Sequence, residues 1–126
     1  MGQVGALLAD AVQLYETEFL AARNLAFRSR REYLNDLKDL LMYLTSVAGV
    51  FDPGQVSRRH LDGYLAELDR RGFSGSTRRR KVASIRSFFS FLQETGILQV
   101  SPALKLIPPA RKRMQPRVLS ESEYKR

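Results

Sequence analysis

Residues 77–89 read TRRRKVASIRSFF, a stretch that joins a strongly basic start to a regular apolar pattern. At about 100° per residue, as in an α-helix, the apolar residues gather on one side. That side holds Val82, Ile85, Phe88, Phe89 and, just beyond the stretch, Leu92. The opposite side carries small or cationic residues, namely Arg80, Ala83, Ser87 and Ser90, with Arg79 and Arg86 at its edge. The stretch therefore predicts an amphipathic helix with a basic outer face.

The rest of the chain has the same helical spacing, and no stretch alternates with the period of two that is typical of strands. We expect four main helices, over about 4–22, from Ser29 to Gly49, from Ser57 to Gly72, and from Ser76 or Thr77 to Gly96. The residues expected to form the core in the first three are Leu8, Val12, Tyr15, Phe19, Tyr33, Leu37, Leu40, Leu41, Leu44, Leu61, Tyr64, Leu65 and Leu68. The fold class is therefore predicted to be all-α.

Polar residues mark the expected helix starts. Ser29 and Glu32 have the spacing of a capping box, in which the hydroxyl accepts an N–H and the glutamate returns to the cap. Ser57 is expected to cap the third helix, and Asp52-Pro53-Gly54 is expected to form a turn before it.

Beyond Ser101-Pro102, residues 105–117 read KLIPPARKRMQPR, with three prolines, five basic residues and no acid. Adjacent Pro108 and Pro109 exclude a helix there and favour extended backbone. The sequence therefore predicts one domain over 1–100, a basic linker over 101–118, and the start of a further domain over 119–126, where Ser120 and Glu123 form another capping-box pattern.

Composition narrows the functional classes. The chain carries a formal charge of +8 and has a pI near 10.3, so a polyanion is the first partner to consider. It has no cysteine and a single histidine, His60, which argues against a metal cluster of thiolates or imidazoles, and we expect no metal and no cofactor. Asp10, Glu16 and Glu18 interrupt the N-terminal apolar residues too soon for a signal peptide. No apolar run reaches membrane-spanning length, so we expect a cytoplasmic protein without a membrane partner.

The charges are segregated along the chain. From Arg70 to Gln93 there are seven basic residues and no acidic one, and from Arg23 to Arg31 there are four basic residues and again no acid. Such clusters can simply solvate the outside of a helix. A solvated surface usually mixes the two signs, as Asp36, Lys38 and Asp39 do in the second helix, so the segregation favours a surface for a polyanion.

Several motifs resemble one family. Residues 80–92, RKVASIRSFFSFL, are similar to R-[RK]-L-S-A-L-R-S-F-[FY]-x-[FY]-L in the N-terminal core-binding domain of tyrosine recombinases, the phage-integrase and Xer-like enzymes. Residues 29–37 resemble that family's [ST]-x-x-x-Y-x-x-D-L, S-P-A at 101–103 stands where the family often has N-P-A, and PRVLSESEYKR resembles the start of its catalytic domain. Ala83 and Ser84 are transposed relative to the usual order, which we expect to alter DNA contacts rather than the fold.

The resemblance implies a small orthogonal, SAM-like bundle of four helices that forms one jaw of a clamp around a recombination half-site. Its second and fourth helices would meet double-stranded DNA, and other protomers would join it in a tetramer. The catalytic groups would lie beyond Arg126, so the resemblance implies no enzyme activity and no catalytic residue in this chain. The residues expected to contact DNA are Arg28, Ser29, Arg30, Arg31, Thr77, Arg78, Arg79, Arg80, Lys81 and Arg86, with weaker linker contacts from Arg111, Lys112 and Arg113. Most would contact phosphates, and Arg80 is the one expected to reach toward bases.

Two other functions fit the same residues. A helix-turn-helix transcriptional regulator would have a short turn before its recognition helix, and the loop GFSGS at 72–76 has nearly that length. A helical protein-interaction module would use the basic face to bind an acidic partner and would not prefer duplex DNA over other polyanions of equal charge.

Overall fold

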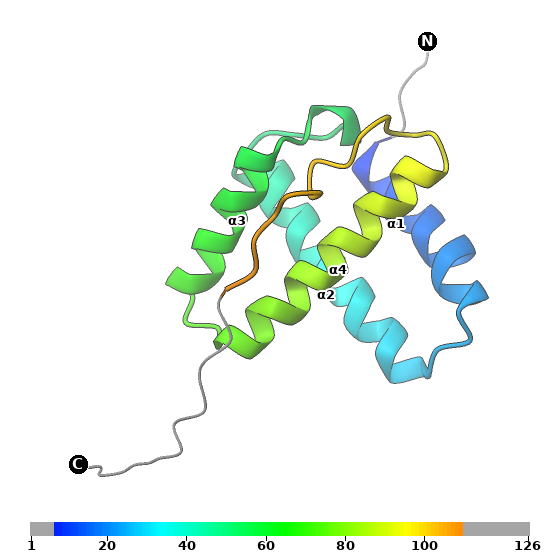
Figure 1. The fold of residues 1–126 in the computed structure, drawn as a ribbon, viewed down its shortest axis with the longest axis horizontal. Coiled ribbons are helices and arrows are strands. Elements are labelled where there is room, and N and C mark those ends of the chain that lie inside the picture. The colour runs from blue at the N-terminus through cyan, green and yellow to red at the C-terminus, as the bar shows by residue number, and fades with distance from the viewer. Residues whose placement is uncertain (1–6, 110–126) are drawn as a thin grey trace.

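Two long helices that cross each other organise the fold. The computed structural model describes residues 7–109, and within that range every regular element is helical, which confirms the all-α class. The elements are α1 (Leu8–Leu14), the π-helical segment η1 (Tyr15–Leu20), α2 (Phe27–Ser46), the 3-10 turn η2 (Pro53–Gln55), α3 (Arg58–Arg70) and α4 (Gly75–Glu94). Figure 1 shows α4 crossing α2, with α1 on one side of the crossing and α3 on the other.

The first helix changes its winding at Tyr15. The helix expected over 4–22 begins later, at Leu8, because Leu7 before it is extended, and it contains a π-helical segment that the sequence did not predict. Within this segment the Tyr15 ring stacks on Phe19 at 4.8 Å between centroids and meets Phe88 and Phe91 of α4 edge-on, both at 5.6 Å. Its hydroxyl lies 2.8 Å from the Ser87 hydroxyl, so the aromatic contacts and this hydrogen bond join the first helix to α4.

The predicted start of α2 is wrong. The helix begins at Phe27, and Ala26 at its N-cap provides no side-chain hydrogen bond. Ser29 therefore lies inside the first turn, and it cannot act as the cap of a box with Glu32.

The other two starts rest on serine hydroxyls. Ser57 caps α3 as expected, accepting the N–H of His60 at 3.3 Å, while His60 Nδ1 accepts the N–H of Ser57. For α4, however, the cap is Ser74, whose hydroxyl accepts the N–H of Thr77 at 3.1 Å, so the helix starts earlier than the predicted Ser76 or Thr77. Asp52 accepts the N–H of Gly54, as expected for the turn at η2.

The helix ends and the core follow the prediction. Gly49, Gly72 and Gly96 have φ values of +69°, +88° and +86°, the left-handed conformation that ends a helix and that a side chain would strain. All residues expected in the core are buried or packed against it, and the largest fully buried side chains are Tyr15, Tyr64, Phe88 and Phe89.

The segment after α4 packs more closely than a tether. Ala103 and Leu106 are 0% exposed, although both fall in the stretch expected to be linker. Ser101 donates its N–H to the Gln93 side chain at 2.8 Å, and its hydroxyl accepts the N–H of Ala103. The packed part of the chain thus extends beyond residue 100, to Leu106. The remaining linker and the expected helix start at Ser120 fall largely outside the described residues.

Candidate nucleic-acid interface

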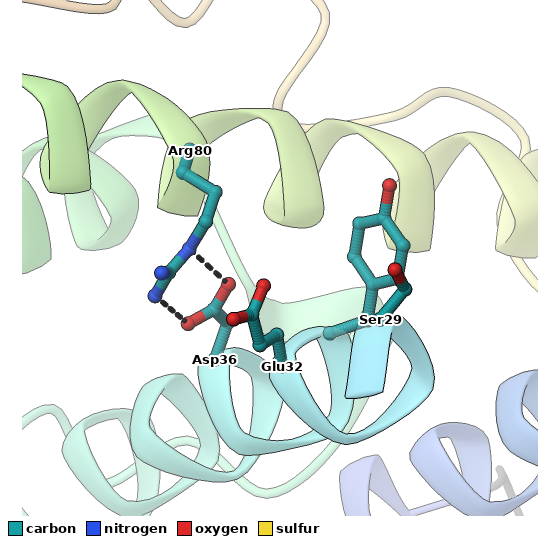
Figure 2. A pocket seen from close by; sticks show the side chains of 5 residues that line it. Ser29, Glu32, Asp36 and Arg80 are labelled. Atoms are coloured by element: carbon teal, nitrogen blue, oxygen red, sulfur yellow. Dashed lines mark hydrogen bonds and ion pairs between the residues drawn. The ribbon is translucent and has the colours of Figure 1, made fainter. Parts of the chain in front are cut away.

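A buried carboxylate lies where α2 and α4 cross. Asp36 of α2 is 3% exposed and accepts hydrogen bonds from three residues of α4. Arg80 donates from Nη2 at 2.8 Å and from Nε at 3.3 Å, one to each oxygen; Lys81 Nζ lies at 3.1 Å and the Ser84 hydroxyl at 2.9 Å. Figure 2 shows Arg80 extending from α4 to the carboxylate on α2. These bonds fix the two helices against each other at one point.

This junction bears on three expectations from the sequence. Asp36 is buried, rather than part of a solvated stretch of mixed charge. Lys81 is 7% exposed and its ammonium is held by Asp36, so it does not lie on the outer surface where a direct DNA contact would place it. Ser84 is likewise buried and donates a hydrogen bond to Asp36, so the transposed Ala83-Ser84 order bears on the packing of the helices, which was not expected.

The sequence pattern placed these side chains of α4 wrongly because it assumed that only one side of the helix is buried. In the structure α4 packs against α2, α3 and η1. Residues 80, 81 and 84 fall on the side that meets α2, and the outward face is correspondingly narrower.

Acidic residues from α2 and α3 pair with much of the basic stretch between Arg70 and Gln93. Within residues 7–109 at least five of its seven cations form ion pairs, and those not yet described are Arg70 with Glu67, Arg71 with Asp39 and Glu67, and Arg78 with Asp69. The charge segregation seen along the sequence is therefore largely removed in space at α3 and α4.

The start of α2 keeps its positive charge. Within residues 7–109, Arg28, Arg30 and Arg31 form no ion pair, and Arg30 Nε is buried without a hydrogen-bond partner. The Arg31 guanidinium lies 5.7 Å from the centroid of the Phe27 ring, which is 74% exposed. An open groove of about 400 Å³ is lined by Phe27, Arg28, Arg31, Glu32 and Asn35. Phe27 and Asn35 were not among the expected contacts, although their spacing from Arg31 places them on the same side of the helix.

The start of α4 supplies a second set of cations. Thr77 is partly buried at the first turn, and Arg78 is paired with Asp69 at 3.5 Å. The Arg79 side chain extends toward Gly75. The Arg80 side chain remains 45% exposed despite its pair with Asp36, and that hydrogen bond, opposed by partial burial, raises the pKa of Arg80. It thus stays charged and partly accessible.

Arg86 has a hydrogen-bond partner within the chain. Its guanidinium donates to the carbonyl oxygen of Leu106, and so it anchors the segment that follows α4. Arg111, Lys112 and Arg113, expected to make weaker contacts, lie outside the described residues.

The starts of α2 and α4 form a surface suited to an anionic ligand. In Figure 1 the N-terminal ends of α2 and α4 both lie at the lower side of the molecule, below the crossing. Helix N-termini present free N–H groups and partial positive charge, and here arginines flank them. In the part of the chain that the structure describes, no group of three His, Cys, Asp or Glu residues could hold a metal ion. None of the helices between residues 7 and 109 is long and apolar enough to span a bilayer.

Comparisons with known proteins show which family the sequence resembles. Residues 12–96 match the family model described as "Phage integrase, N-terminal SAM-like domain". The chain is 26% identical over 111 residues to tyrosine recombinase XerD of Listeria monocytogenes, covering 88% of the chain and 37% of that protein. It is 31% identical to tyrosine recombinase XerC of Pelotomaculum thermopropionicum and 32% to XerD of Oceanobacillus iheyensis, each time over 82% of the chain and 35% of the relative. The chain thus spans about a third of the length of these curated relatives, and no solved structure matches it significantly.

Proposed function

The chain belongs to the phage integrase N-terminal SAM-like domain family, and on this premise we propose that it binds duplex DNA through the starts of α2 and α4. The bound surface would be formed by Arg28, Ser29, Arg30, Arg31, Thr77, Arg78, Arg79 and Arg80. Lys81 would act from inside the fold, by holding Asp36, and Arg86 by anchoring the segment that follows α4.

The observation that carries this proposal is the cluster of three arginines in the first turns of α2. Arg28, Arg30 and Arg31 form no ion pair within the described residues, whereas five cations of the 70–93 stretch do. Unpaired arginines that repel one another are costly to the free protein, and DNA phosphates offer the partners that they lack.

In the longer protein, this domain would position rather than catalyse. We propose that it clamps a recombination half-site and places a catalytic domain absent from this chain, with other protomers joining on the DNA as a tetramer in the cytoplasm. Loss of a domain that only positions would lower DNA affinity and specificity but leave the chemical groups of the catalytic domain unchanged.

The observation that favours a helix-turn-helix regulator is the short connection, residues 71–74, between α3 and α4. The family match and the Xer relatives favour the recombinase domain instead.

Selection from a pool of random duplexes at two salt concentrations, followed by sequencing, tests the proposal. We expect retention that falls steeply with salt and an enriched motif. Retention without preference over heparin of equal charge would instead support the protein-interaction alternative. Absence of retention at low salt would overturn DNA binding.

A further inference from the structure

An exposed carboxylate lies on the proposed DNA surface. Glu32 of α2 is exposed and lines two neighbouring depressions. One is the groove with Arg28 and Arg31, and the other is a smaller cleft of about 90 Å³, bordered by Ser29, Tyr33, Asp36 and Arg80. Figure 2 shows the Glu32 side chain extending from α2 toward α4, beside Asp36 and below Arg80.

Neither a cap nor a bond within the described residues explains this carboxylate, although its charge is one of the lesser causes that raise the pKa of Arg80. It is not a capping residue, because α2 begins at Phe27 and Ser29 is no cap. It forms no ion pair or hydrogen bond within residues 7–109, even though Arg28 lies one turn before it and Arg80 lies nearby on α4. An acid surrounded by arginines yet bonded to none of them is available for another donor.

On a surface that binds phosphates, such a charge is unfavourable unless something compensates for it. A carboxylate repels the DNA backbone and weakens binding to every sequence alike. It can only accept hydrogen bonds, and the base-edge donors of the major groove are the amino groups of cytosine N4 and adenine N6. A base pair that presents one of these amino groups would therefore restore the binding free energy lost to this repulsion, and other base pairs would not.

We propose that Glu32 is a specificity-determining residue whose carboxylate accepts a hydrogen bond from the exocyclic amino group of a cytosine or adenine in the major groove. The inference rests on the proposed DNA binding through α2 and adds to it a side chain that reads a base. The neighbouring arginines hold the phosphates, and Glu32 penalises sequences without an amino group at that position.

The experiment compares the parent chain with Glu32→Ala and with Glu94→Ala as a matched control. Glu94 is an exposed acid at the last residue of α4, at the opposite end of that helix from the proposed contacts. Both substitutions remove one carboxylate from an exposed helix position. Each protein is used in the same random-duplex selection, and its affinity for the selected duplex and for unrelated duplexes is measured by fluorescence anisotropy.

For Glu32→Ala we expect tighter binding to unrelated duplexes but roughly five- to tenfold weaker discrimination at one base-pair position of the motif. Glu94→Ala should keep the parent's motif at every position, and both variants should unfold at the parent's urea midpoint.

Two results would overturn the inference while DNA binding stands: a Glu32→Ala motif identical to the parent's at each position, or a parent chain that binds duplexes without any motif. Absence of duplex binding by the parent at low salt would overturn the proposed function itself. The two failures are thus distinguishable.

Discussion

Asp36 on α2 and Lys81 on α4 form an ion pair of 3.1 Å in which the side chains are only 3% and 8% exposed. Charges so far from water are tolerated only when they are paired and hydrogen-bonded. Ser84 and the more exposed Arg80 provide the remaining hydrogen bonds to the carboxylate. The two helices proposed to contact DNA are thus joined by a buried polar junction whose parts depend on one another.

Replacing the Asp36 carboxylate should therefore destabilise the fold. Asp36→Ala leaves the Lys81 ammonium buried with the Phe73 ring, 5.3 Å away, but without a carboxylate, and we expect the free energy of unfolding to fall by about 3–5 kcal/mol. Urea denaturation measures it. The double variant Asp36→Ala/Lys81→Met should recover much of the loss, since it removes the unpaired charge. A single variant no less stable than Asp10→Ala, which removes an exposed carboxylate, would contradict this role of the junction.

The junction also marks the limit of what the sequence predicts. Helix periods, the glycines that end helices and the apolar core depend on near neighbours in sequence, and these predictions were confirmed. The bonds of Asp36 reach residues 44 to 48 positions away, and no local pattern reports them. A charged residue beside a leucine in a Y-x-x-D-L pattern looks the same whether it is solvated or buried.

The candidate site was predictable to a similar degree. Basic composition correctly placed arginines at the start of α2, but Asp39, which pairs with Arg71, and Asp69, which pairs with Arg78, lie on other helices and become their neighbours only after folding. The starts of α2 and α4 were mispredicted, whereas the cap at Ser57 was predicted correctly. Ser29 had the spacing of a capping box and Ser76 or Thr77 was expected to begin a helix, but both helices begin earlier, at Phe27 and Gly75.

The packed segment after α4 should contribute to stability. Leu106 is 0% exposed, whereas its apolar neighbour Ile107 is 70% exposed, so Ile107 can serve as the control for a substitution of Leu106. We expect Leu106→Ala to lower the free energy of unfolding by about 2–4 kcal/mol, because a buried side chain is lost and a cavity remains. Ile107→Ala should change it by no more than about 0.5 kcal/mol. Equal effects of the two substitutions in urea denaturation would show that the segment does not pack on the helices in solution.

Asp39 should make the stability depend on pH. Burial alone would raise its pKa, but hydrogen bonds from Tyr64 and Arg71 outweigh burial and hold the pKa of Asp39 below its usual value. A depressed pKa in the folded state adds stability above the unfolded pKa, about 4, and that stability is lost as the pH falls through the lower, folded value.

We therefore expect Asp39→Asn to be less stable than the parent by about 1 kcal/mol at pH 6, with the difference shrinking as the pH falls below about 4. Urea titrations at pH 6, 4 and 3 measure this. Asp10→Asn, at an exposed site with no ion pair to any residue of the range 7–109, should match the parent at all three pH values. A difference for Asp39→Asn that stays constant from pH 6 to 3 would contradict the assignment.

Two arginines with opposite surroundings provide the sharpest test of the DNA surface. Arg28 is exposed and forms no ion pair within the described residues, whereas Arg71 is held by Asp39 and Glu67. A cation that contacts a phosphate releases a counterion on binding, so its loss lowers the slope of log K against log salt by about one unit. We expect that change for Arg28→Ala, measured by fluorescence anisotropy between low and moderate salt, and a slope close to the parent's for Arg71→Ala. Because Arg71 stabilises the fold through its two carboxylates, its variant should instead lose stability in urea. If Arg71→Ala changed the salt slope and Arg28→Ala did not, the DNA surface would have to lie at the end of α3 instead of the start of α2.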